Sequence, residues 1–158
     1  MNDEALDFWD QYIETLTEKP ISPNIEVGIS GNIDIADELL CLYLSGKKTA
    51  GSSLVKDYEL AGDPLPKIGD YWIILNSLDE PKCIVKTVRV EHFKFSDVPE
   101  EVAVCEGEGD LSVEYWKKAH VDFFTPFLEA WGVSDLGEET VVTEFYEIVY
   151  KSNKSRLN

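Results

Sequence analysis

Residues 70–93 read DYWIILNSLDEPKCIVKTVRVEHF and contain two apolar segments around a turn-like sequence. Residues 70–76 and 82–93 are rich in β-branched and aromatic side chains, which are favoured in strands. Successive side chains of a strand point to opposite faces, and residues 82–93 alternate in this way. The SLDEP between them carries turn formers. The stretch therefore predicts two antiparallel strands joined by a turn.

One further strand and three helices complete the predicted elements. Residues 140–150, TVVTEFYEIVY, have the composition of a strand. Apolar residues spaced three to four apart predict amphipathic helices at residues 3–18, 34–45 and 112–131. Pro126 is expected to kink or end the third helix. This order of elements predicts an α+β domain with a mainly antiparallel, barrel-like sheet flanked by helices.

Length, composition and charge limit the kinds of protein that this chain can be. The 158 residues are 44% hydrophobic and carry a net charge of -17, which fits one domain with a packed core. That charge disfavours extended contacts with duplex DNA or RNA. The acidic N-terminus has no signal-peptide pattern and no apolar segment is long enough to span a membrane, so we expect a cytoplasmic protein without a membrane partner. Cys41, Cys83 and Cys105 are far apart, which predicts three buried thiols rather than a disulfide or zinc site.

The segment SGKKTAGSSL, residues 45–54, concentrates two lysines and three hydroxyl side chains. A phosphate-binding loop is disfavoured, because Cys41 stands where its first glycine is required. The segment has the composition of a helix end: Asp34 is the expected N-cap of that helix and Gly46 its left-handed terminal residue. The alternative is a catalytic pair in which Lys47 beside Lys48 helps one amine to activate a hydroxyl.

The segment CEGEGDLSVEYW, residues 105–116, presents three carboxylates at alternate positions. In an extended segment, Glu106, Glu108 and Asp110 would face one side. Such a loop would orient a lysine, act as acid or base, or hold a divalent metal through oxygen ligands. The alternative is an acidic loop that caps the next helix, which Asp110 would do alone.

The aromatic residues of the third predicted helix share a face with a histidine. His120 lies four residues after Trp116 and four before Phe124, a pattern more typical of a core histidine than of one facing a ligand. Trp72, Tyr115 and Trp116 are expected in the core, with stacking on a base at a pocket mouth as the alternative.

In combination these motifs resemble one family. They are SGKKTAGSS, P-x-x-G-D-Y-W-I-I-L, C-I-V-K-T-V-R-V, F-x-D-V-x-x-E-x-A, EGEGDLSVEYW and K-x-x-H-x-x-F-F. Over roughly residues 25–150 the chain resembles the ASCH domain, specifically the bacterial group with the EGEGD motif. The resemblance implies a PUA-like β-barrel at residues 25–151. A helix and linker at 1–24 would pack on this domain, and residues 152–158 would form a polar tail.

The resemblance also implies a cleft lined by the G-x-K segment and a role in RNA metabolism. Some smaller relatives are amidohydrolases on acylated cytidine nucleosides, with a lysine, a threonine and a glutamate in the site. Lys48 matches that lysine, while Gly51 stands at the threonine position, so another hydroxyl would have to substitute. The candidate catalytic residues are Lys48, Thr49, Glu106 and Glu108, and the candidate ligand-binding residues are Lys47, Ser52, Ser53, Asp110, Trp116 and His120.

The leading hypothesis is a cleft that binds a nucleotide, nucleoside or RNA end without a cofactor. Lys48, with Lys47 nearby, would contact the anionic or polar group, and Glu106 or Glu108 would orient the lysine or receive a base amine. Two hydrolase alternatives are an amidohydrolase on acylated cytosine nucleosides and a metal-assisted ribonuclease that uses Glu106, Glu108 and Asp110. The last is a binding module that recognises a basic partner through its acidic surface.

Overall fold

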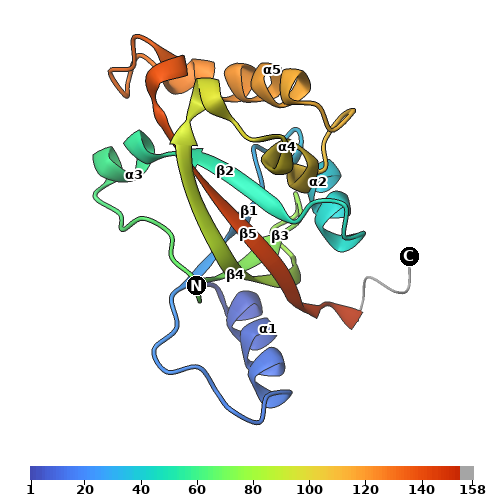
Figure 1. Cartoon of the computed structure of the whole chain (residues 1–158). Coiled ribbons are helices and arrows are strands. Elements are labelled where there is room, and N and C mark those ends of the chain that lie inside the picture. The colour runs from blue at the N-terminus through green and yellow to red at the C-terminus, as the bar shows by residue number, and fades with distance from the viewer. Residues whose placement is uncertain (154–158) are drawn as a thin grey trace. The chain divides into compact units, whose positions relative to one another are not determined.

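The computed structural model describes residues 1–153, which fall into two compact units. Unit 1 contains residues 1–46, 68–88 and 146–153, and unit 2 contains Lys47–Lys67 and Arg89–Phe145. Five strands form one sheet in the order β1-β3-β4-β5-β2, and β4 and β5 contribute to both units (Figure 1). The strands are β1 Ile25–Ile29, β2 Ala50–Leu54, β3 Tyr71–Leu75, β4 Pro81–Lys94 and β5 Thr140–Lys151. The predicted α+β class is confirmed.

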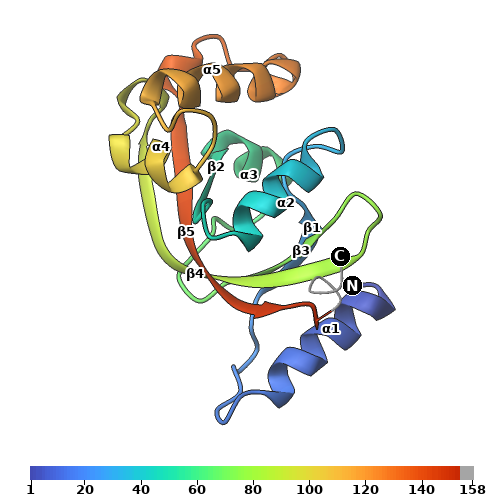
Figure 2. The same ribbon diagram turned by 90° about the vertical axis from the view of Figure 1, so that its right-hand side faces the viewer.

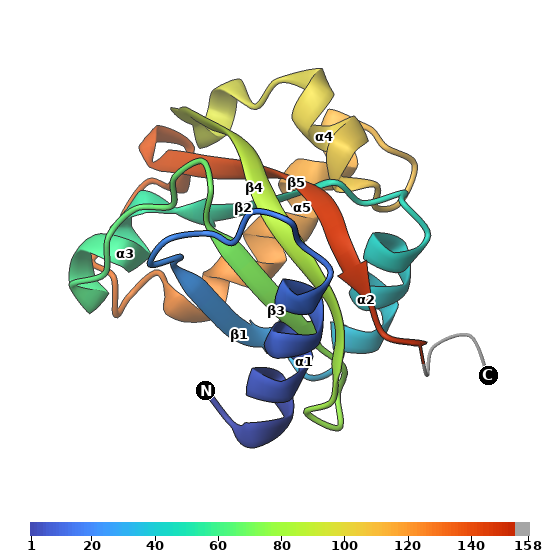
Figure 3. The same cartoon turned by 90° about the horizontal axis from the view of Figure 1, so that it is seen from below.

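Unit 1 is built around the predicted hairpin. Strands β3 and β4 pair antiparallel, as the sequence predicts, and β1 adds to β3 in parallel. Helix α1, Asp3–Glu14, begins at Asn2, whose side chain accepts a hydrogen bond from the Ala5 backbone N–H at 2.8 Å. Figure 3 shows α1 beside β1 and β3, and its residues Phe8, Trp9 and Tyr12 form a core with these strands.

Helix α2, Ala36–Leu44, also belongs to unit 1. The expected cap at Asp34 is wrong, because the helix begins after Ile35 without a side-chain cap. Instead, Asp37 in its first turn accepts hydrogen bonds from the backbone and hydroxyl of Ser77. Gly46 follows the helix with a φ of +80°, the left-handed conformation that the sequence predicts.

Unit 2 packs three helices with β2 and the first half of β5. Strands β2 and β5 pair antiparallel, with Ala50 opposite Phe145 and Leu54 opposite Val141. The helices are α3 Val55–Ala61, α4 Glu100–Glu106 and α5 Val113–Phe124, and three single turns of 3-10 helix lie at Phe95–Asp97, Thr125–Phe127 and Leu136–Glu138. Figure 2 shows α4 and α5 together, where Val102 of α4 and Trp116 of α5 enter one core.

Several expectations need correction. The third predicted helix is shorter than residues 112–131, since α5 ends at Phe124 and a 3-10 turn containing Pro126 follows, as the proline predicts. The sequence did not predict β1, β2, α3 or α4. Cys83 is buried, but Cys41 is exposed and Cys105 is half-buried. Of the three aromatic residues expected in the core, Trp72 packs against Tyr43 and Tyr146 and Trp116 is buried, but Tyr115 is exposed.

Of the expected polar tail at residues 152–158, residues 154–158 lie outside the described part of the structure. Within residues 1–153, no helix has the length and apolar character needed to cross a membrane.

Candidate functional site

Lys48 lies in the short connection between α2 and β2, and its side chain is buried. Its Nζ lies 3.2 Å from Oε1 of Glu106 and 3.0 Å from Oε2 of Glu108. The same amine donates to the backbone carbonyl of Glu106 at 3.3 Å. Only 4% of Lys48 is exposed. Two adjacent carboxylates favour the protonated amine over the neutral one, so Lys48 is a buried cation shared by two acids.

The two motifs meet through their backbones. Gly107 ends α4 with a φ of +70°, and a Cβ at this position would lie 2.1 Å from the carbonyl oxygen of Lys47. Two residues after Lys47, the Thr49 N–H donates to the carbonyl of Cys105 at 2.7 Å. Only glycine allows both the left-handed conformation and this close approach. Gly107 of EGEGD is therefore needed to seat the GKKT segment beside Glu106.

The expected alternation of three carboxylates on one side is wrong. Glu106 is the last residue of α4 and is 2% exposed, whereas Asp110 is exposed. The side chain of Ser112 and its backbone N–H, which donates to the Asp110 carboxylate at 2.9 Å, both lower the pKa of Asp110. Ser112 in turn caps α5 by accepting from the Tyr115 N–H. Within residues 1–153, no group of three or more His, Cys, Asp or Glu side chains is placed to hold a metal ion.

Glu106 is the centre of a buried network. Oε1 faces Lys48 and also lies 3.5 Å from Nε2 of His120. Oε2 accepts from the hydroxyl of Ser52 at 2.8 Å and from the indole N–H of Trp116. Burial alone would raise the pKa of this carboxyl, but Lys48, His120 and Trp116 together lower the pKa of Glu106 to about 2. Glu106 is therefore a buried, ionised carboxylate whose two oxygens are both occupied.

A chain of hydroxyls leads away from Glu106. Ser52 Oγ and Thr143 Oγ1 lie 2.6 Å apart, because β2 and β5 place these residues opposite each other. An ionised carboxylate only accepts hydrogen bonds, so Ser52 donates to Glu106 and Thr143 donates to Ser52. Sequence reasoning missed Thr143, for which the only signal is its place in a strand.

Glu108 is the outer member of the site. Its side chain is 24% exposed, and its Oε2 is held by Lys48. Within residues 1–153 its other oxygen, Oε1, has no hydrogen bond. This carboxylate thus combines a fixed position with one oxygen that is open to a hydrogen-bond donor.

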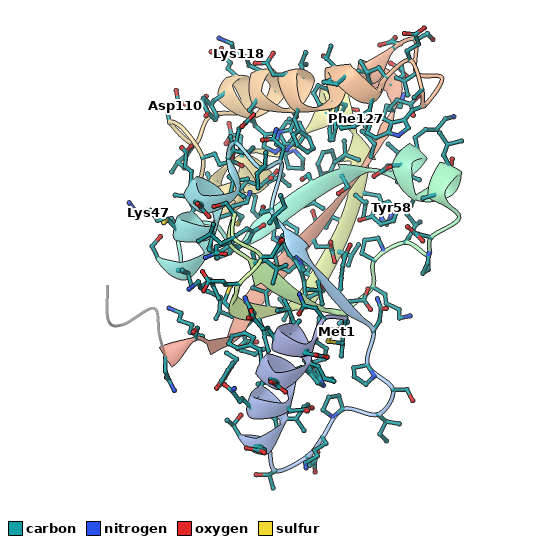
Figure 4. The ribbon with its side chains drawn as sticks, turned by 180° about the vertical axis from the view of Figure 1, so that it is seen from behind. Met1, Lys47, Tyr58, Asp110, Lys118 and Phe127 are labelled. Carbon is teal, nitrogen blue, oxygen red and sulfur yellow. The ribbon has the colours of Figure 1, made fainter. Side chains whose placement is uncertain are left out.

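The remaining predicted residues lie at different distances from this network. Lys47 and Thr49 are exposed, and Figure 4 shows Lys47 and Asp110 pointing away from the ribbon. The hydroxyl of Thr49 contacts the carbonyl of Cys105 at 3.4 Å. Ser53 is half-buried and pairs with Val142 across β2 and β5. The structure therefore brings together Lys48, Ser52, Glu106, Glu108, Trp116 and His120, but not Lys47, Thr49, Ser53 or Asp110.

Comparisons with known proteins agree with this picture. A family model described as the ASCH domain matches residues 26–150. An ASCH domain from Lactobacillus crispatus has a similar crystal structure, with 25% sequence identity and a TM-score of 0.86 over 95% of this chain and 96% of that chain. A protein from Enterococcus faecalis is 26% identical, with a TM-score of 0.87 over 100% of this chain and 95% of that chain. No curated protein matches the chain significantly.

The structural similarities confirm the α+β fold of the PUA-like type that the sequence predicts. The family match includes both segments that build the site, from the GKKT residues to the EGEGD residues. Because it spans most of the sequence, the chain belongs to the ASCH domain family.

Proposed function

We propose that this ASCH domain binds a nucleoside, nucleotide or RNA end, and that Glu108 accepts a hydrogen bond from the base. The observation that carries the proposal is the half-buried Glu108 carboxylate, with one oxygen fixed by Lys48 and the other open. Carboxylates are suitable acceptors for the exocyclic amine of a base such as cytosine. A carboxylate already held in place loses little conformational freedom when it binds.

In this proposal Lys48 positions Glu108 and does not bind a phosphate. Its amine is already shared by Glu106 and Glu108, and the Lys48 side chain is only 4% exposed. A phosphate would have to displace one of these carboxylates and approach the other. The exposed cation next to it in the chain, Lys47, is the better partner for the phosphate of a nucleotide or an RNA end.

The geometry supports binding better than hydrolysis. A general base needs an available electron pair near neutral pH, yet the two carboxylates keep Lys48 protonated. The lowered pKa of Glu106, about 2, makes its carboxylate a weak base. Gly51 stands where the amidohydrolases have their threonine, and the Thr49 hydroxyl lies near Cys105 instead. Each of these observations disfavours the amidohydrolase alternative.

The test is a calorimetric titration with cytidine, cytidine monophosphate and a short single-stranded RNA. In Glu108→Gln, Lys48 attracts the amide oxygen, so the amide nitrogen would face the base amine and donor would meet donor. We expect at least about a tenfold loss of affinity, equivalent to about 1.4 kcal/mol. Glu114→Gln, an exposed change in the first turn of α5, is the matched control.

Equal binding by Glu108→Gln and the wild type would overturn the role of Glu108. Absence of binding to all three ligands would overturn the proposed function. Turnover of an acylated cytidine that Lys48→Ala abolishes would instead establish the amidohydrolase alternative.

A further inference from the structure

His120 is a buried titratable group that the proposed ligand contact does not use. Its Nδ1 lies 2.8 Å from the backbone carbonyl oxygen of Trp116. A carbonyl oxygen only accepts hydrogen bonds. Nδ1 must therefore carry a proton and donate it, whatever the charge of the ring.

The other ring nitrogen faces a carboxylate. Nε2 lies 3.5 Å from Oε1 of Glu106. If the ring were neutral, its single proton would be on Nδ1, and Nε2 would present a lone pair to the negatively charged oxygen. A second proton on Nε2 converts this repulsion into attraction, because both nitrogens of a charged imidazole are donors.

The aromatic surroundings also suit a charged ring. His120 stacks on Trp116 with ring centroids 4.0 Å apart and an angle of 22° between the planes. The face of an indole is the best aromatic surface for a cation. Phe124 contacts the imidazole from the following turn of α5, with centroids 5.7 Å apart.

We propose that His120 carries a proton on both ring nitrogens in the folded site and acts as a positioning residue for Glu106. The charged groups of the site are Lys48 before β2, Glu106 at the end of α4, Glu108 in the following turn and His120 on α5. With His120 protonated, two cations balance two anions. This balance offsets the cost that burial imposes on each single charge.

The second proton has a consequence for Glu108. When the charged His120 balances the negative charge of Glu106, the Lys48 amine can hold both Glu106 and Glu108. Loss of the Nε2 proton leaves Glu106 with Lys48 as its only cation and draws the amine away from Glu108. His120 would thus control how firmly Lys48 holds the ligand-binding carboxylate. This consequence rests on the proposed function, whereas the protonation of His120 does not.

The experiment is nitrogen-15 NMR of the histidine rings in the ligand-free protein. The chain has two histidines, and the exposed His92 serves as an internal reference, assigned with His92→Gln. At about pH 7.5, where an ordinary histidine is mostly neutral, we expect both nitrogens of His120 to resonate as protonated. In Glu106→Gln, the His120 nitrogens should move to the neutral pattern, with a single proton on Nδ1.

A neutral His120 in the wild-type protein under these conditions would overturn the proposal, whether its one proton is on Nδ1 or on Nε2. The wild-type spectrum decides this even if Glu106→Gln fails to fold. Because no ligand is present, the outcome is independent of whether a nucleoside binds.

Discussion

Replacing Lys48 by methionine removes the charge of the buried amine and keeps much of its length. Glu106, which is 2% exposed, would then remain buried with a negative charge and without its closest cation. Removal of one partner from a buried ion pair costs about 3–5 kcal/mol. The net lowering of the Glu106 pKa from 4.5 to about 2, in which Lys48, His120 and Trp116 together outweigh burial, corresponds to about 3 kcal/mol at neutral pH. A loss of this size is a large part of the 5–15 kcal/mol that stabilises a typical domain.

The assay is urea unfolding of four proteins: the wild type, Lys48→Met, Glu106→Gln and the double variant. Because the cost arises from an unpaired buried charge, the double variant should be more stable than Lys48→Met. Far-UV circular dichroism at zero urea checks that each variant folds. A loss below about 1 kcal/mol in Lys48→Met, the value of an exposed ion pair, would refute the reasoning, as would a double variant that is no more stable than Lys48→Met.

The pH dependence of the stability of the same proteins tests the Lys48–Glu106 interaction independently. In the wild type the pKa of Glu106 is lower in the folded than in the unfolded chain. Its contribution is therefore present above about pH 4.5 and is lost as the pH falls toward 2. In Lys48→Met the pKa of Glu106 should be higher than in the wild type, because the largest contribution that lowers it is removed, so the stability difference between the two proteins should shrink on acidification. A constant difference between the two proteins from neutral to acidic pH would contradict this.

Two further predictions concern the backbone and the thiols. Gly46→Ala should cost about 1–2 kcal/mol, which is the cost of the left-handed conformation alone, since no atom lies within 4 Å of the added Cβ. Gly107→Ala has the same conformational cost and should lose about 1–3 kcal/mol more, because its Cβ would clash with the backbone of Lys47. Equal unfolding midpoints for the two variants would contradict the close approach. In the native protein a thiol reagent should modify the exposed Cys41 at once, while burial, which raises the pKa of Cys83 to about 12, should protect Cys83 until the chain unfolds. Mass spectrometry of labelled peptides measures the order, and early labelling of Cys83 would show that the core of unit 1 is open.

Local sequence signals predict much of the fold. The β3–β4 hairpin follows from two segments of β-branched and aromatic residues around a turn, and those signals do not depend on distant contacts. Pro126 ends α5 because it cannot donate a backbone hydrogen bond inside a helix. The seven residues of α4 are too few for a helical period to stand out, although Gly107 is a typical residue to follow a helix.

The candidate site depends on contacts between distant segments of the chain to a greater extent than the fold does. The co-occurrence of GKKT and EGEGD indicates that Lys48 lies near the glutamates, and the structure places their charged groups within 3.2 Å. Burial of Glu106 could not be predicted, because its position depends on α4. The contact between Ser52 and Thr143 joins residues 91 positions apart and is set by the register of β2 and β5, which no local pattern reveals.

The most direct test of the central claim is a crystal structure of the protein with bound cytidine. We expect the exocyclic amine of the base within hydrogen-bonding distance of Glu108 Oε1, with the Lys48 amine still between Glu106 and Glu108. A nucleoside bound away from Glu108, or a Lys48 side chain turned outward to contact the ligand, would contradict the account.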